Sequence, residues 1–208
     1  DDMIADSGEI RVTCPRGTDF AGPGPGWRDK PKEDVTVIRF PMSVFAPVPA
    51  AGFSGRAALA GFLMGTGSRY YEPYGRSLSA PLTAHFENGM LTGFSGEPAD
   101  VATANDHYDD ISVRFGIDRN AVHSWHAGIH PGCGFHIPVE HSFLRWSGGA
   151  FGNPRILHFH TCGAYAPGEI SWNILDPTIR IDGVAVWEDG RLHPDRIPGG
   201  ADILDRYP

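Results

Sequence analysis

Histidines are the residues of this sequence best suited to chemistry. The stretch "HSWHAGIHPGCGFHIPVEH" (123–141) holds five of the ten histidines, and "RILHFHTCG" holds two more. Imidazole is the commonest metal ligand in proteins. His158 and His160 are two apart in a β-type run, so their side chains project from the same face and could take two positions around Zn or Fe. The alternative is a hydrogen-bonded pair on a polar strand face.

The longer histidine stretch does not predict a helical metal site. His123, His126 and His130 have helical spacing, but three glycines and Pro131 interrupt the segment, which disfavours a helix. The HExxH motif of helical zinc proteases is absent. We therefore expect a shaped loop over residues 127–136, which could still direct an imidazole into a cleft.

Two other chemistries find little support. Cys14, Cys133 and Cys162 are widely spaced and form no CxxC pair, so a thiolate zinc site is not indicated. An odd number of separated cysteines suits reduced thiols, and we predict a cytoplasmic location. A serine hydrolase is not indicated either, because no GxSxG motif is present.

Composition disfavours two classes of binding partner. The chain has 208 residues and a net charge of −8, which disfavours nucleic acid or an anionic membrane as the main partner. No apolar run approaches the length of a membrane span. The 27 glycines and 18 prolines are spread along the chain, as in a β-rich domain with many turns. We predict a single domain over residues 1–208.

Periodicity predicts an α+β fold, a mainly antiparallel β-sheet domain with one or two helices. Two hairpins are indicated, one over 82–95 around Asn88-Gly89 and one over 178–193 with turns at Asp182-Gly183 and Asp189-Gly190. Helical spacing favours a helix within 97–117. Further strands are expected over 9–15, 34–41, 155–161 and 169–177, whereas residues 55–65 fit a helix or a strand equally well.

The order of these segments carries a family resemblance. "GEIRVTCPRGTDF", "FPMSVFAPVP", "PLTAHFENGMLTGFSG", "WHAGIHPG" and "EISWNILDPTIRIDGVAVWEDGRL" together resemble the C-terminal region of thermophilic-type aminopeptidases and 2,5-dihydroxypyridine 5,6-dioxygenases. The resemblance runs from about Gly8 to Leu192. It implies an aminopeptidase/dioxygenase C-terminal-like fold, and it implies that the N-terminal domain of the family is absent.

The same resemblance implies an altered metal site. The metal-binding H-x-D pair of the family falls on Ser171 and Asn173, a hydroxyl and an amide that are weak ligands without charge. His126 matches a histidine that helps to hold iron in the dioxygenase branch. His158 or His160 lies close to another active-site position.

Two functional hypotheses follow from that altered site. The first is a non-catalytic protein that binds a peptide or a small aromatic ligand and presents it to partner enzymes of a biosynthetic pathway, without a cofactor. Exposed strand edges could also pair two copies as a homodimer. Its cleft would comprise residues already introduced and two tryptophans: His126, His158, His160, Ser171, Asn173, Trp125 and Trp172. The alternative is an Fe(II) ring-cleaving dioxygenase or a metal-dependent hydrolase, with Fe or Zn on a rearranged site of His126, His158 and His160.

Overall fold

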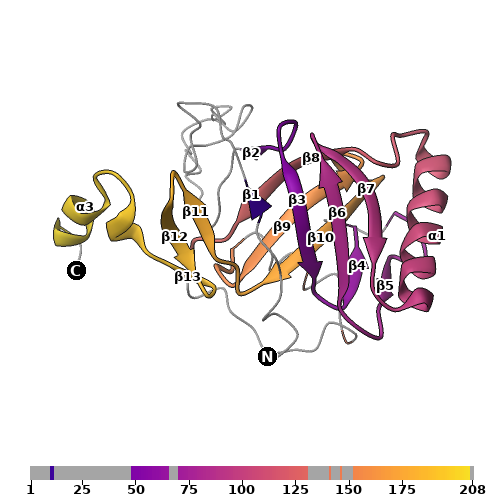
Figure 1. Cartoon of the computed structure of the whole chain (residues 1–208), viewed down its shortest axis with the longest axis horizontal. Helices are drawn as coiled ribbons and strands as arrows, with labels where there is room; N and C mark the ends of the chain where they lie inside the picture. Colours follow the sequence, from indigo (N-terminus) through magenta and orange to yellow (C-terminus); the bar gives the residue numbers. More distant parts are fainter. Residues whose placement is uncertain are drawn as a thin grey trace, which may run out of the picture.

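Antiparallel sheets dominate the structure, a computed structural model that describes residues 10–11, 48–65, 70–130, 141, 146 and 152–206. One sheet has the strand order β1 (Ile10–Arg11), β3 (Ser54–Leu59), β6 (Leu82–Glu87) and β7 (Met90–Ser95). A second has the order β2 (Val48–Pro49), β8 (Val122–Ala127), β9 (Ile156–Cys162), β10 (Glu169–Leu175), β4 (Phe62–Met64) and β5 (Gly75–Ser77). Figure 1 shows the first sheet crossing over the second.

The remaining elements are a small sheet and the helices. Strands β11 (Ile179–Ile181), β12 (Val184–Glu188) and β13 (Arg191–Leu192) form a three-stranded sheet. Helix α1 (Pro98–Phe115) lies beside β7, and the 3-10 helix η4 (Pro194–Arg196) and helix α3 (Gly200–Arg206) extend away from the sheets at the C-terminal end (Figure 1). The predicted α+β class with mainly antiparallel sheet is confirmed. No helix within the described part of the chain is both long and apolar enough to cross a membrane.

Both predicted hairpins are present, with the predicted turn residues. Asn88 and Gly89 have φ values of 50° and 75°, as a two-residue type I′ turn requires. Gly89 also lies so close to the backbone of Ala50 and Ala51 that a Cβ would collide with it. Asp182-Gly183 joins β11 to β12, and Asp189-Gly190 joins β12 to β13, again with positive φ at all four residues.

The predicted helix is α1, and its ends follow the local sequence. Pro98 occupies the first turn, where its missing N–H is no loss. Gly116 ends the helix in the left-handed conformation, with φ 64°, and its N–H donates to Ser112 O. The helix buries Ala104, Tyr108 and Ile111, which recur at helical spacing on one face.

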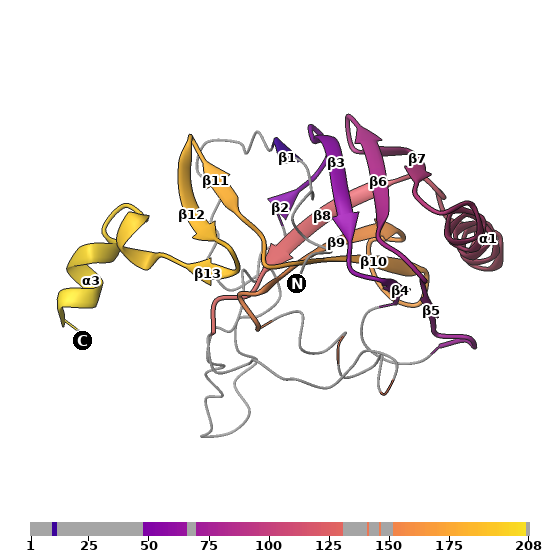
Figure 2. The ribbon, with the colours of Figure 1, turned by 60° about the horizontal axis from the view of Figure 1, so that its bottom comes forward.

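The hydrophobic core fills the space between the two larger sheets, which Figure 2 shows as two layers. Phe86 on β6 contacts Phe159 on β9 and Trp172 on β10, with ring centroids 5.9 and 5.6 Å apart. Side chains alternate between the two faces along each strand. The residues on either side of Phe159 on β9 and of Trp172 on β10 therefore face away from this core.

The structure also decides one open alternative and leaves some predictions untested. Residues 55–65 form strands β3 and β4 and no helix. The predicted strand over 34–41 and the stretch 131–140 lie outside the described residues, and only Ile10–Arg11 is described of the strand predicted over 9–15. The resemblance to the aminopeptidase and dioxygenase C-terminal region, and the single domain over 1–208, remain predictions.

Candidate metal centre

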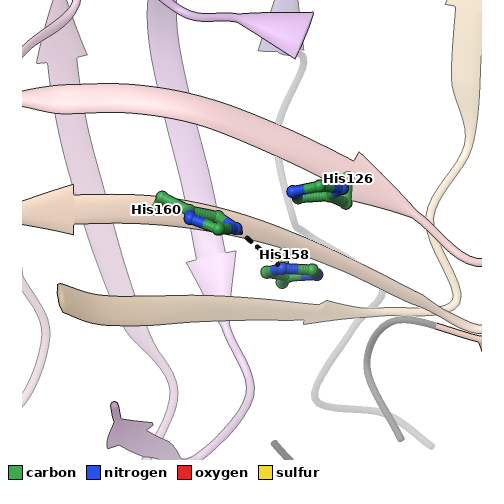
Figure 3. Close-up of side chains that lie close together, drawn as sticks. All are labelled: His126, His158 and His160. Atoms are coloured by element: carbon green, nitrogen blue, oxygen red, sulfur yellow. Dashed lines mark hydrogen bonds between the residues drawn. The ribbon is translucent and has the colours of Figure 1, made fainter. Parts of the chain in front are cut away.

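Three histidines from two neighbouring strands come together on one face of the six-stranded sheet. His126 on β8 stands directly opposite His158 on β9 in the antiparallel register, and His160 follows two residues later on the same strand. Directly opposed and alternate residues share a face. Figure 3 shows the three rings close together, His126 on β8 and the other two on β9, and the rings of His126 and His158 are stacked with centroids 4.8 Å apart. All three are buried, with at most 4% of their surface exposed.

The spacing of the imidazoles suits a single metal ion. His158 Nε2 and His160 Nε2 are 3.1 Å apart. Two nitrogens bound to one ion at about 2.1 Å are separated by about 3.0 Å at a right angle and about 3.4 Å at the tetrahedral angle. One ligand atom of each histidine lies within 4.8 Å of the others, so the most distant pair needs to close by about 1.5 Å around an ion. The stacked rings of His126 and His158 also need to turn their nitrogens toward it.

His160 is held in the orientation that turns Nε2 toward the cluster. Its Nδ1 lies 2.9 Å from Ala164 O, and an Nδ1–H that donates to this carbonyl leaves the Nε2 lone pair for a metal. Glu169 Oε1 lies 3.7 Å from the same Nδ1, and this carboxylate is buried as well. A backbone carbonyl or a carboxylate beyond a ligating histidine is a recurrent feature of metal sites. Here Ala164 O holds the ring, and Glu169 lies behind the same nitrogen.

Burial keeps the cluster in the form that binds metals. The pKa of His158 lies well below its ordinary value, chiefly because burial penalises the charged ring and also because His126 and His160 are close. Burial likewise lowers the pKa of His160, against the raising effect of its hydrogen bond to Ala164. Neutral imidazoles have a free lone pair, so little proton competition opposes metal binding at neutral pH.

Ser171 and Asn173 lie next to the histidines on β10. Ser171 pairs with His160, and Asn173 pairs with His158. Both are buried, with 3% and 1% of their surfaces exposed. Neither Nδ2 nor Oδ1 of Asn173 has a hydrogen-bond partner among the described residues. The predicted alternation is present, with Ser171 and Asn173 on one face and Trp172 on the other.

The two tryptophans expected in the cleft lie elsewhere. Trp125 and Trp172 belong to the hydrophobic core on the opposite face of the sheet, with 2% and 0% of their surfaces exposed. The indole N–H of Trp172 donates to Tyr108 OH at 2.6 Å. The physical reason is the two-residue period of a strand, which turns Trp125 away from His126 and Trp172 away from its neighbours Ser171 and Asn173.

The other described histidines do not join the cluster. His123 is half-buried and its Nε2 lies 2.9 Å from Cys162 O. His107 is a buried residue of α1, and His141 is exposed. His126 itself lies on a strand, just before the stretch expected to be a loop. Sequence reasoning missed Glu169, although alternation from Ser171 already places residue 169 on the same face.

Comparison with known proteins adds no identification. No protein-family model, no curated protein and no solved structure matches the chain.

Proposed function

We propose that this chain is a metal-dependent enzyme whose His126, His158 and His160 hold one Zn²⁺ or Fe²⁺ ion and leave coordination positions for water and substrate. The observation that carries the proposal is the position of three buried imidazoles, each with a ligand atom within 4.8 Å of the others. Such an ion polarises a substrate oxygen or activates a bound water molecule.

The number of ligands favours catalysis over a structural role. Structural zinc sites are closed by four protein ligands, whereas catalytic sites have three and keep an open position. Among the described residues, no fourth histidine, cysteine or carboxylate belongs to the group. Glu169 is not a member of this three-histidine group, but its carboxylate contributes negative charge 3.7 Å from His160 Nδ1.

The register supports the rearranged site anticipated from the family resemblance. The expected H-x-D ligands would stand at residues 171 and 173 on β10. His160 and His158 occupy the directly opposed positions on β9. Ligands moved to the neighbouring strand would project from the same face into the same region. This supports the metal-dependent hypothesis over the non-catalytic peptide- or ligand-binding hypothesis.

Metal content tests the first half of the proposal. Protein purified without chelator, then loaded with Zn²⁺ or anaerobically with Fe²⁺ and desalted, should hold about one ion per chain. His126→Ala, His158→Ala and His160→Ala should each lose stoichiometric metal. His85→Ala is the matched control, because His85 lies on β6 and bonds Ser95 at 2.7 Å. Absence of metal from the loaded wild type would overturn the proposal in favour of the non-catalytic hypothesis.

The coordination shell tests the second half. X-ray absorption of the zinc-loaded protein should show three imidazole nitrogens and at least one oxygen donor that cyanide displaces. Hydrolysis of 4-nitrophenyl acetate, as a general probe of activated water, should require the metal and disappear in His158→Ala. A shell of four protein ligands that cyanide does not change would mark a structural centre and contradict the enzyme assignment.

A further inference from the structure

A buried amide beside the histidines lacks the partners that such a group requires. Asn173 has 1% of its surface exposed, and both polar atoms of its side chain lack a hydrogen-bond partner among the described residues. An unsatisfied buried amide destabilises the fold. Leucine has the same branched arrangement of four side-chain heavy atoms and would avoid that penalty. The presence of asparagine here therefore indicates a bound group that satisfies it.

The position of Asn173 directs that group toward the metal centre. Asn173 stands directly opposite His158, and His158 in turn stands opposite His126. Opposed residues of an antiparallel pair have Cβ atoms about 4.5–5.5 Å apart. A molecule that coordinates an ion at the histidines and extends by one or two atoms toward β10 therefore comes within hydrogen-bond reach of the amide.

Charge indicates which kind of molecule this is. Three neutral imidazoles leave the two positive charges of a divalent ion uncompensated, and Glu169 supplies one negative charge nearby. A net positive charge in a buried site favours a monoanionic ligand. A carboxylate fits, since one oxygen binds the metal while the other accepts a hydrogen bond from Asn173 Nδ2.

An apolar cluster on the same side of the sheet indicates that the rest of the ligand is apolar. Met64 on β4 pairs with Ser171, and Phe62 lies two residues earlier on the same strand. Together with Ala60, Trp146 and Leu175 they form a separate hydrophobic cluster, in which the rings of Phe62 and Trp146 are 5.5 Å apart. Leu175 follows Asn173 by two residues, so this cluster borders the amide.

We propose that Asn173 is a ligand-binding residue that holds, next to the metal, a monocarboxylate with an apolar body. The carboxylate coordinates the ion, the Asn173 amide donates to its second oxygen, and the apolar part lies toward Phe62, Met64 and Trp146. This inference rests on the proposed metal centre, and it assigns the substrate or inhibitor class that this centre accepts.

Cobalt spectroscopy tests the inference with the intact chain. Co²⁺-loaded wild type should show a saturable change in its visible spectrum with benzoate and a weaker response with acetate. Asn173→Leu should bind Co²⁺ as tightly as wild type but benzoate about tenfold to a hundredfold less tightly, as expected for the loss of a hydrogen bond to a charged group. Asn105→Leu is the matched control, because the amide of Asn105 lies on α1 and donates to Val101 O.

Stability supplies a readout that a purely structural asparagine would not give. Without ligand, Asn173→Leu should melt at a higher temperature than wild type, because it removes the unsatisfied amide. Asn173→Asp, which keeps the shape and adds a negative charge, should also weaken benzoate binding. It serves as the second variant if the leucine protein does not fold.

The outcomes separate this inference from the proposed function. Failure of wild type to bind Co²⁺ would remove the metal centre itself. Co²⁺ binding with equal benzoate affinity in wild type and the Asn173 variants would overturn the role of Asn173 and leave the metal centre standing. Acetate binding as tightly as benzoate would overturn the apolar part of the assignment.

Discussion

Glu169 and His160 form a buried carboxylate–imidazole pair, with Glu169 Oε1 3.7 Å from His160 Nδ1. The pair lies at the start of β10 and near the end of β9, where the strands are joined by the turn that contains Ala164. It places negative charge behind one of the three candidate ligands.

Removing the charge of Glu169 should weaken metal binding. We expect Glu169→Gln to lower Zn²⁺ affinity about tenfold to a hundredfold, the usual effect of losing a carboxylate behind a ligating histidine. Competition with a chromophoric chelator measures the affinity. Glu87→Gln is the control, since Glu87 is exposed on β6. Equal affinities of Glu169→Gln and wild type would contradict this supporting role.

A side chain at Gly128 should disturb the centre indirectly. A Cβ at this position would collide with the backbone of Gly152 and Asn153, and Gly128 lies two residues beyond His126. We expect Gly128→Ala to lower the free energy of unfolding by about 1–3 kcal/mol and to weaken metal binding. Urea unfolding and the chelator assay measure the two effects. Gly52→Ala is the control, because its added Cβ would meet nothing within 4 Å.

His107 should make the protein less stable in mild acid. Burial, with smaller contributions from Arg76 and Arg114, lowers the pKa of His107 to about 4, against the opposing effect of Asp110. The folded state keeps this ring neutral, whereas the unfolded chain takes up a proton below about pH 6.5. The contribution to stability is therefore complete above about pH 6.5 and is lost as the pH falls toward 4.

The measurement for His107 compares two variants across pH. Between pH 7 and pH 5, wild type should lose about 2 kcal/mol more of its free energy of unfolding than His107→Leu does. His85→Leu, which changes a half-buried histidine on β6, should follow wild type. If His107→Leu loses as much stability as wild type over this range, the ring is not held neutral in the fold.

Tyr108 should stabilise the core without affecting metal binding. Its hydroxyl accepts the indole N–H of Trp172 at 2.6 Å and also bonds Thr161 Oγ1. Tyr108→Phe leaves the Trp172 N–H buried without a partner, so we expect a loss of about 1–3 kcal/mol in urea unfolding. Metal content should be unchanged, because this network faces the core and the histidines face away from it. Tyr70→Phe, at a residue with 58% exposure, is the control.

Local patterns in the sequence determined the elements and the faces of the strands. Asn88-Gly89, Asp182-Gly183 and Asp189-Gly190 predicted their turns because few other residues adopt positive φ readily. The two-residue period of a strand placed His158 with His160, and Ser171 with Asn173, without knowledge of any neighbour. These predictions depend only on residues close together in the chain.

The tertiary structure decided which faces meet. Antiparallel pairing of β8, β9 and β10 places His158 between His126 on one side and Asn173 on the other. These three positions are far apart in sequence. The same pairing adds Glu169 to the centre and places Trp125 and Trp172 in the core. Strand order and register are set by long-range packing of one face against the second sheet, and no local pattern specifies them.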